Sequence, residues 1–122
     1  MPQVEVGRVY DPRTDPAALR VLVDRVWPRG LSKDRADLDR WCRDVAPSTE
    51  LRRWYGHAPE RFGDFARRYR AELDEPERAE ALRDLTEGVG GRRLILLTAT
   101  RDVTISHATV LAEVLRSEAG DD

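Results

Sequence analysis

Two short polar segments hold the residues of this sequence that are best suited to chemistry. Residues 24–29 contain an aspartate, two arginines and a tryptophan, and residues 98–107 contain threonines, an arginine, an aspartate, a serine and a histidine. The planar fork of arginine donates two parallel hydrogen bonds to a carboxylate or phosphate. Histidine titrates near neutral pH and can carry a proton in a reaction. The two segments therefore predict a site for a small anionic ligand.

Nine residues of the two segments are assigned an expected role. In an enzyme, His107 would act as general acid or base, and Asp24 would orient it or a water molecule. The expected ligand-binding residues are Arg25, Trp27, Arg29, Thr98, Arg101, Asp102 and Ser106. The two histidines and the single cysteine form no zinc pattern, and neither a glycine-rich phosphate loop nor a nucleophile elbow is present. No metal site and no cofactor are predicted.

Structural interpretations compete with these functional ones. Asp24 and Arg25 could form an internal ion pair that fixes the loop, and Trp27 could be a core or lid aromatic. His107 could simply bond to a neighbouring carbonyl group. His57 precedes a proline and is interpreted as a structural turn residue, and Cys42 as an inert core thiol.

Two buried strands are expected to position the polar segments. Residues 19–23 and 94–97 are apolar on both faces, which is typical of strands covered on both sides. In open α/β sheets, ligands bind beyond the carboxyl ends of parallel strands. If the two strands are parallel neighbours, their polar segments face a common crevice. Residues 4–9 predict a further strand.

Helices are predicted between and after these strands. Leu38, Trp41, Cys42 and Val45 fall at helical spacing and predict one helix. Further helices are expected to begin at three N-terminal signals, Ser48, Pro59 and Pro76. Ser106 is expected to cap a last helix, whose free N–H groups would favour an anion at its start.

These elements predict an α/β fold in a single compact domain, residues 1–122. A small, mostly parallel sheet of about three strands would be packed by about five helices. A chain of 122 residues is long enough for one core and too short for two ordinary domains.

Composition limits the possible partners. The formal net charge of −2 argues against nucleic-acid binding driven by bulk charge. The lone cysteine suits a reducing compartment, and neither a membrane span nor a signal-peptide layout is visible. We therefore predict a cytoplasmic protein without membrane contact, and no pattern in the sequence indicates an oligomeric state.

Four strings of the sequence resemble a known family. Residues 20–30 (RVLVDRVWPRG), 46–52 (APSTELR), 54–57 (WYGH) and 106–111 (SHATVL) are similar to the YeaO-like branch of a bacterial family of unknown function. The resemblance covers nearly the whole chain. It implies a compact α/β fold and no established substrate.

The chain departs from the wider family at the positions of its cysteines. That family pairs a strand ending in Asp-Val-Arg with a cysteine-containing loop and a Cys-His-Arg helix start. Here Thr98 stands near one cysteine, Ser106 at the other, and Ala108 replaces the arginine. The resemblance therefore implies no thiol or metal chemistry for this chain.

Two classes of function remain open at this point. The first is a protein that binds, and possibly acts on, a small anionic ligand. The second is a nucleic-acid-binding or regulatory protein-interaction module, based on arginines at 52, 53, 67, 68 and 70 with Trp54 and Tyr55 nearby. Acidic residues are interleaved with these arginines, which is usual for a solvated helical face, so nucleic acid is the weaker expectation.

Overall fold

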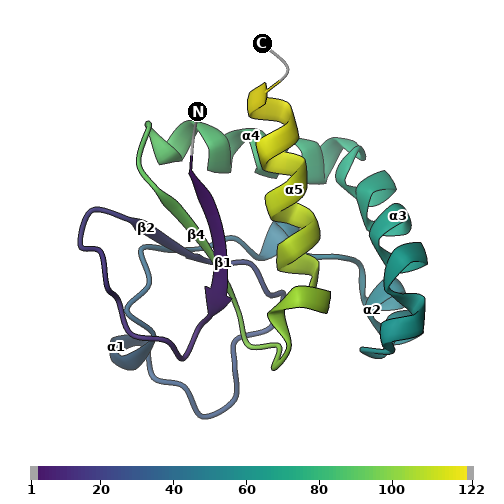
Figure 1. The fold of residues 1–122 in the computed structure, drawn as a ribbon, viewed down its shortest axis with the longest axis horizontal. Helices are drawn as coiled ribbons and strands as arrows, with labels where there is room; N and C mark the ends of the chain where they lie inside the picture. The colour runs from purple at the N-terminus through teal and green to yellow at the C-terminus, as the bar shows by residue number, and fades with distance from the viewer. Residues whose placement is uncertain (1–2, 121–122) are drawn as a thin grey trace.

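A sheet of four parallel strands organises the computed structural model, which describes residues 3–120. The strands are β1 (Val4–Arg8), β2 (Leu19–Leu22), β3 (Arg40–Trp41) and β4 (Leu94–Thr98). Their order is β1-β4-β2-β3, so β4 pairs with both β1 and β2 (Figure 1). The predicted strands and their parallel arrangement are confirmed. The sheet has one strand more than the sequence predicted, because the two-residue β3 adds to its edge.

The strands are apolar on both faces because each face of the sheet is covered. Along β4, Leu94 and Leu96 join a large core on one face, whereas Ile95 and Leu97 pack into a smaller cluster on the other. Side chains alternate between the faces of a strand, so a continuous apolar run supplies both cores. The larger core contains aromatic residues of α2 and α3, and the smaller one is closed by residues of the loop after β2 and of α1.

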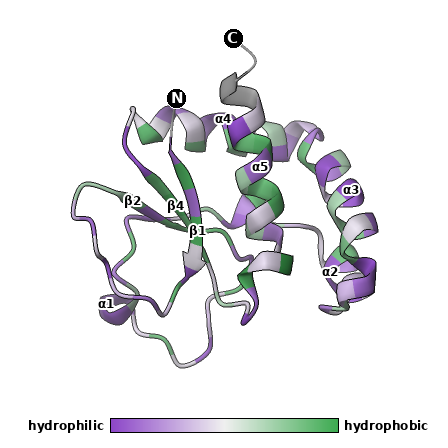
Figure 2. Ribbon diagram, in the orientation of Figure 1, coloured by the Kyte–Doolittle hydropathy of each residue, from purple (hydrophilic) through white to green (hydrophobic). Residues whose placement is uncertain are grey.

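Five α-helices accompany the sheet within the described residues. They are α1 (Lys33–Ala36), α2 (Thr49–Tyr55), α3 (Phe62–Leu73), α4 (Pro76–Val89) and α5 (His107–Gly120), with short 3-10 turns at Arg43–Val45, Pro59–Arg61 and Val103–Ile105. Figure 1 shows α2 and α3 on the opposite side of the molecule from α1, and Figure 2 shows hydrophilic and hydrophobic residues mixed along these helices. The side chains of residues 118–120 are outside the description.

Local signals set the limits of α2 as predicted. The Ser48 side chain accepts a hydrogen bond from the Leu51 N–H, which satisfies a free donor at the start of the helix. Gly56 ends the helix in the left-handed conformation, at φ 53°, and its N–H bonds to the Arg52 carbonyl. His57 is also left-handed, at φ 57°. This second left-handed residue is unusual because it carries a side chain.

The helix predicted from Leu38, Trp41, Cys42 and Val45 is wrong. Residues 40–41 form β3, and the Cys42 N–H bonds to the Leu22 carbonyl at 2.8 Å. Leu38 packs in the smaller cluster, whereas Val45 lies in the larger core. Leu38 and Val45 therefore pack on opposite faces of the sheet, although their spacing is helical. The segment forms hydrogen bonds with the edge of β2 and not those of a helix.

The overall class is nevertheless the predicted one, a single compact α/β domain. Within residues 3–120, no helix combines the length and the apolar character needed to cross a membrane.

Candidate functional site

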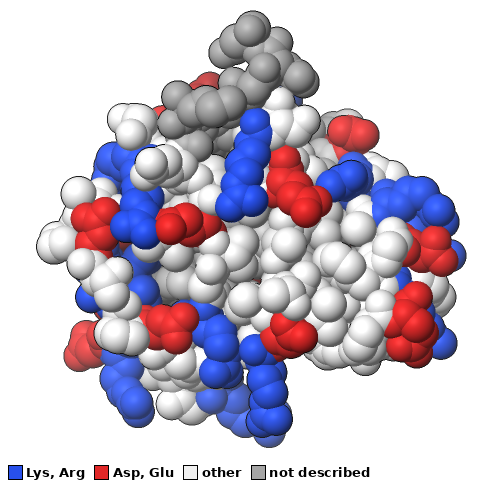
Figure 3. Space-filling view, in the orientation of Figure 1, with Lys and Arg blue, Asp and Glu red and all other residues white. Residues whose placement is uncertain are grey.

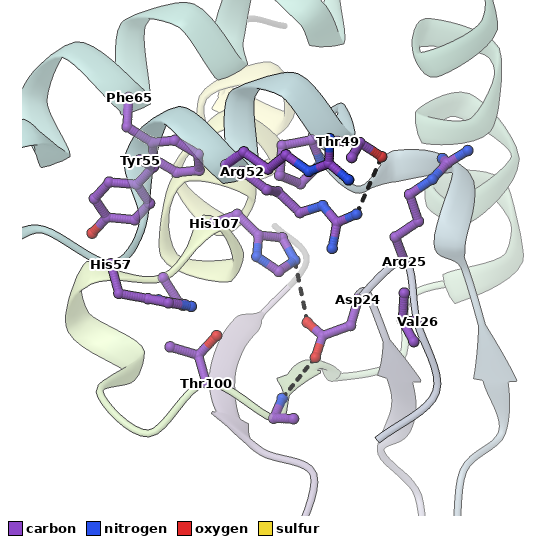
Figure 4. A pocket seen from close by; sticks show the side chains of 14 residues that line it. Asp24, Arg25, Val26, Thr49, Arg52, Tyr55, His57, Phe65, Thr100 and His107 are labelled. Atoms are coloured by element: carbon purple, nitrogen blue, oxygen red, sulfur yellow. Dashed lines mark hydrogen bonds and ion pairs between the residues drawn. The ribbon is translucent and has the colours of Figure 1, made fainter. Parts of the chain in front are cut away.

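A cavity of about 570 Å³ lies at the edge of the sheet where β2 and β4 end. Its wall is built by the segments after these two strands, by α2 and by the start of α5 (Figure 4). Because the strands are parallel, their carboxyl ends lie at the same edge, as expected from the sequence. The polar and aromatic residues of the wall are Asp24, Arg25, Thr49, Arg52, Arg53, Tyr55, His57, Phe65, Thr100, Ser106 and His107.

Asp24 joins the ends of the two strands. Its carboxylate accepts hydrogen bonds from the Thr98 hydroxyl at 2.7 Å and from the Ala99 N–H at 2.8 Å. His107 Nε2 lies 3.4 Å from Asp24 Oδ1. Among the described residues, Asp24 forms no ion pair with Arg25, so the predicted alternative of an internal Asp–Arg pair is not what fixes the loop. The carboxylate instead holds β4 against the end of β2.

His107 is held by the main chain as well as by Asp24. Its Nε2 lies 2.9 Å from the Val23 carbonyl oxygen, which can only accept, so Nε2 carries a hydrogen. The ring is 11% exposed and meets Tyr69 edge-on at 6.0 Å between centroids. The alternative expected for His107, a hydrogen bond to a neighbouring carbonyl group, is thus present in the structure.

Burial lowers the pKa of His107, and Asp24 and the Val23 carbonyl only partly oppose this effect. The Arg52 charge lowers the pKa further. The folded protein therefore binds this proton less readily than the unfolded chain, in which histidine titrates near 6.5. At neutral pH the ring is uncharged and donates through Nε2.

This shift predicts a pH-dependent loss of stability. As the pH falls below about 6.5, the unfolded chain takes up a proton that the folded protein resists, so the free energy of unfolding decreases. A His107→Gln variant keeps a donor for the Val23 carbonyl but cannot titrate. We expect it to lose less stability than the wild type between about pH 7.5 and 5.5, measured by urea unfolding. Equal losses in the two proteins would contradict the assignment, because the carboxylates titrate in both.

Three arginines give the cavity a cationic side. Arg25 follows β2, and Arg52 and Arg53 lie on α2. In Figure 4 the Arg52 side chain extends between His107 and Arg25. Arg52 Nη2 donates to the Thr49 hydroxyl at 3.3 Å, whereas its buried Nε has no partner within the described protein. None of the three guanidinium groups pairs with a carboxylate of the described chain.

The structure brings together only part of the predicted site. Asp24, Arg25, Ser106 and His107 line the cavity, and Thr98 lies behind the wall, bonded to Asp24. The Ser106 hydroxyl precedes α5 as predicted, but it donates to the Val103 carbonyl at 2.8 Å.

The other predicted ligand-binding residues lie away from the cavity wall. Trp27 packs against Trp41, and its indole N–H donates to the Leu31 carbonyl at 2.7 Å. Trp27 is therefore a packing residue, as in the alternative interpretation. Asp102 accepts the Thr104 N–H at 3.1 Å and starts the 3-10 turn before α5. Arg29 and Arg101 are exposed and do not line the cavity.

Sequence reasoning missed the contribution of α2 and of the turn that follows it. Thr49, Arg52, Arg53 and His57 line the cavity, although the two arginines had been considered only as part of a helical surface. A signal for Thr49, Arg52 and His57 existed, since residues 46–52 and 54–57 belong to the strings that carry the family resemblance, whereas Arg53 falls between these strings.

The possible metal ligands and the single cysteine were expected to have no role in a site. Among the described residues, no group of three histidine, cysteine, aspartate or glutamate side chains is arranged to hold a metal ion. Burial raises the pKa of Cys42, so its thiol stays protonated at neutral pH. The side chain packs against the larger core, as an inert thiol would.

The arginine-rich face considered for nucleic acid is occupied by internal contacts. Arg61 and Arg68 lie over the Trp54 ring, at 5.4 and 4.1 Å from its centroid, and so cover the surface on which a base would stack. Arg67 pairs with Asp64, and Arg70 pairs with Glu113. On the face seen in Figure 3, acidic side chains lie among the basic ones. These contacts are typical of a solvated helical face.

Comparisons with known proteins place this architecture among bacterial relatives. The sequence model of a family described as "Inactive DUF488-N3 subclade" matches residues 3–122. The uncharacterized protein Rv3073c of Mycobacterium tuberculosis is 50% identical over 114 residues, which are 93% of each chain. The uncharacterized protein YeaO of Escherichia coli is 38% identical over 115 residues, 93% of this chain and 97% of that one. No solved structure matches significantly.

Proposed function

The chain belongs to the inactive DUF488-N3 subclade, as its resemblance to the YeaO-like branch implied, and from this premise we propose that it binds a small anionic ligand in the cavity without converting it. The ligand's charged group lies against Arg25, Arg52 and Arg53, at the edge where β2 and β4 end.

One observation carries the proposal: three guanidinium groups line one cavity and none is neutralised by a carboxylate of the described chain. Like charges gathered without partners repel each other, and the fold gains nothing from their proximity. Asp24 is the one carboxylate of the wall, and its oxygens already accept hydrogen bonds from Thr98 and Ala99. A bound anion would satisfy the arginines with charge-assisted hydrogen bonds.

The start of α5 supports the same assignment. Ser106 and His107 line the cavity at the N-terminus of this helix, where free N–H groups and the positive end of the dipole favour an anion.

Binding without turnover is favoured over catalysis by the contacts of Asp24, whose oxygens accept hydrogen bonds from Thr98 and Ala99. A general base needs a lone pair within reach of the substrate proton. Because the Nε2 hydrogen of His107 is directed at the Val23 carbonyl, the lone pair of its neutral ring is on Nδ1, and this nitrogen is the group that a reaction would have to use. The description of the subclade as inactive agrees with this assignment.

Isothermal titration with inorganic phosphate, sulfate and succinate at low salt tests the proposal. We expect the wild type to bind at least one of these anions. We expect Arg25→Ala and Arg52→Ala each to weaken that binding by about tenfold or more, since a hydrogen bond to a charged group is worth roughly 1.5–3 kcal/mol. Thermal unfolding should show that both variants remain as stable as the wild type, because these arginines make no ion pair that supports the fold.

Arg83→Ala is the matched control for charge. Arg83 is an exposed arginine of α4, away from the cavity, so its loss removes the same charge without touching the wall. We expect wild-type affinity in this variant. If none of the anions binds, or if the three variants behave alike, the cavity is not an anion site.

A further inference from the structure

Opposite the arginines, the cavity has an aromatic side. Tyr55 and Phe65 stack with ring centroids 4.3 Å apart, and His57 lies 5.9 Å from the Tyr55 ring. Tyr55 and Phe65 are 4% and 1% exposed, and the Tyr55 hydroxyl donates to the Ile105 carbonyl at 2.7 Å. The ring surface that this side offers to a ligand is therefore mainly that of the exposed His57. Figure 4 shows Tyr55, Phe65 and His57 on one side of His107 and Arg25 and Arg52 on the other.

The size of the cavity also exceeds the need of an inorganic anion. At about 570 Å³ it falls within the range of about 300–1,000 Å³ that holds ligands of drug or cofactor-fragment size. A ligand that only satisfied the arginines would leave the His57 ring exposed to water.

The backbone at His57 adds a separate argument. The residue lies in the left-handed region at φ 57°, directly after the left-handed Gly56 that ends α2. Glycine takes this conformation without cost, whereas a residue with a side chain is strained there. The exposed His57 ring makes no hydrogen bond within the described protein that would repay this strain. Strain of this kind is characteristic of binding and switch sites.

From these features, and resting on the proposed anion site, we infer that the ligand is a phosphate monoester of a flat, apolar group. The phosphate lies against Arg25, Arg52 and Arg53, and the ester substituent lies against His57 on the Tyr55 side of the cavity. A phosphate monoester is a dianion with three terminal oxygens, so it can accept from several guanidinium forks at once, whereas a carboxylate has two oxygens. A planar substituent contacts ring surface efficiently, in offset or edge-to-face geometry.

The experiment compares four probes by isothermal titration: phenyl phosphate, inorganic phosphate, phenol and benzoate. We expect phenyl phosphate to bind at least about tenfold more tightly than each of the other three. In His57→Gly, phenyl phosphate affinity should fall by about fivefold to tenfold, and inorganic phosphate affinity should not change. The same variant should melt at or above the wild-type temperature, because glycine relieves the strained backbone.

His57→Ala separates the ring from the backbone. It removes the imidazole but keeps a Cβ in the left-handed region, so we expect it to lose phenyl phosphate affinity like His57→Gly without gaining stability. A merely structural histidine would lower the melting temperature in both variants and leave the ratio of the two phosphate affinities unchanged.

The outcomes distinguish this inference from the anion site on which it rests. If phenyl phosphate and inorganic phosphate bind equally, and only Arg25→Ala and Arg52→Ala weaken them, the anion site stands and the aryl ester is wrong. If benzoate matches phenyl phosphate, the preference for phosphate is wrong. If no probe binds, or if the arginine variants change nothing, both proposals fall.

Discussion

An Asp24→Ala variant is expected to lose about 3 kcal/mol of unfolding free energy, or roughly 10 °C in melting temperature. The substitution leaves the Ala99 N–H without its acceptor and leaves the buried Thr98 hydroxyl with only the Thr100 hydroxyl, 3.1 Å away. A buried donor without a partner costs about 1–3 kcal/mol. His107 also loses the carboxylate that lies 3.4 Å from its Nε2. Urea unfolding at neutral pH measures the loss.

Two further variants give this prediction its controls. Asp24→Asn keeps one acceptor oxygen and should lose less than the alanine variant. Asp44→Ala removes an exposed aspartate from the 3-10 turn after β3 and should stay within about 0.5 kcal/mol of the wild type. If Asp24→Ala is as stable as Asp44→Ala, the carboxylate does not hold the strand ends together, and its place in the cavity wall would have to serve a ligand or a reaction.

An Arg20→Met variant is expected to lose about 2–4 kcal/mol of unfolding free energy. Arg20 is 2% exposed, and its guanidinium donates to the Ala36 and Asp37 carbonyls, each at 2.9 Å. These carbonyls belong to the end of α1, which packs on the face of the sheet opposite the larger core. Methionine fills the space of the aliphatic stem but removes the side-chain donor of the Ala36 carbonyl and leaves the Asp37 carbonyl with only Arg13 Nη2, at 3.1 Å.

The measurement is urea unfolding, combined with hydrogen exchange of the amides in residues 33–37. We expect faster exchange there in Arg20→Met, because the end of α1 is no longer tied to β2. Arg35→Met is the matched control, since Arg35 is an exposed arginine of α1. Equal stability of the two variants would show that the buried arginine contributes no net stabilisation.

The main strands could be predicted because each carries its own signal. The apolar runs of β2 and β4 indicate burial on both faces, and a parallel sheet brings their carboxyl ends to one edge. Asp24, Arg25, Ser106 and His107 were therefore expected at a common site, and all four line the cavity. A strand of two residues has no periodicity of its own, which is why β3 was mistaken for part of a helix.

The arginines of α2 could not be placed by such reasoning. Arg52 and Arg53 have the spacing of ordinary surface arginines on a helix, and only the packing of α2 against α3 and the larger core turns them toward the strand ends. Trp27 shows the converse limit. It follows the same strand as Arg25, but the bend at residues 25–26 carries it to the opposite cluster, where it contacts Trp41.

The order of the strands has a consequence for synthesis of the protein. β4 lies between β1 and β2, yet it is the last strand to leave the ribosome, because it begins only at Leu94. Until then β1 and β2 have no partner between them, and their edges are open to wrong pairing. The cavity needs both β4 and the start of α5, so no nascent chain that ends before His107 carries the complete cavity wall.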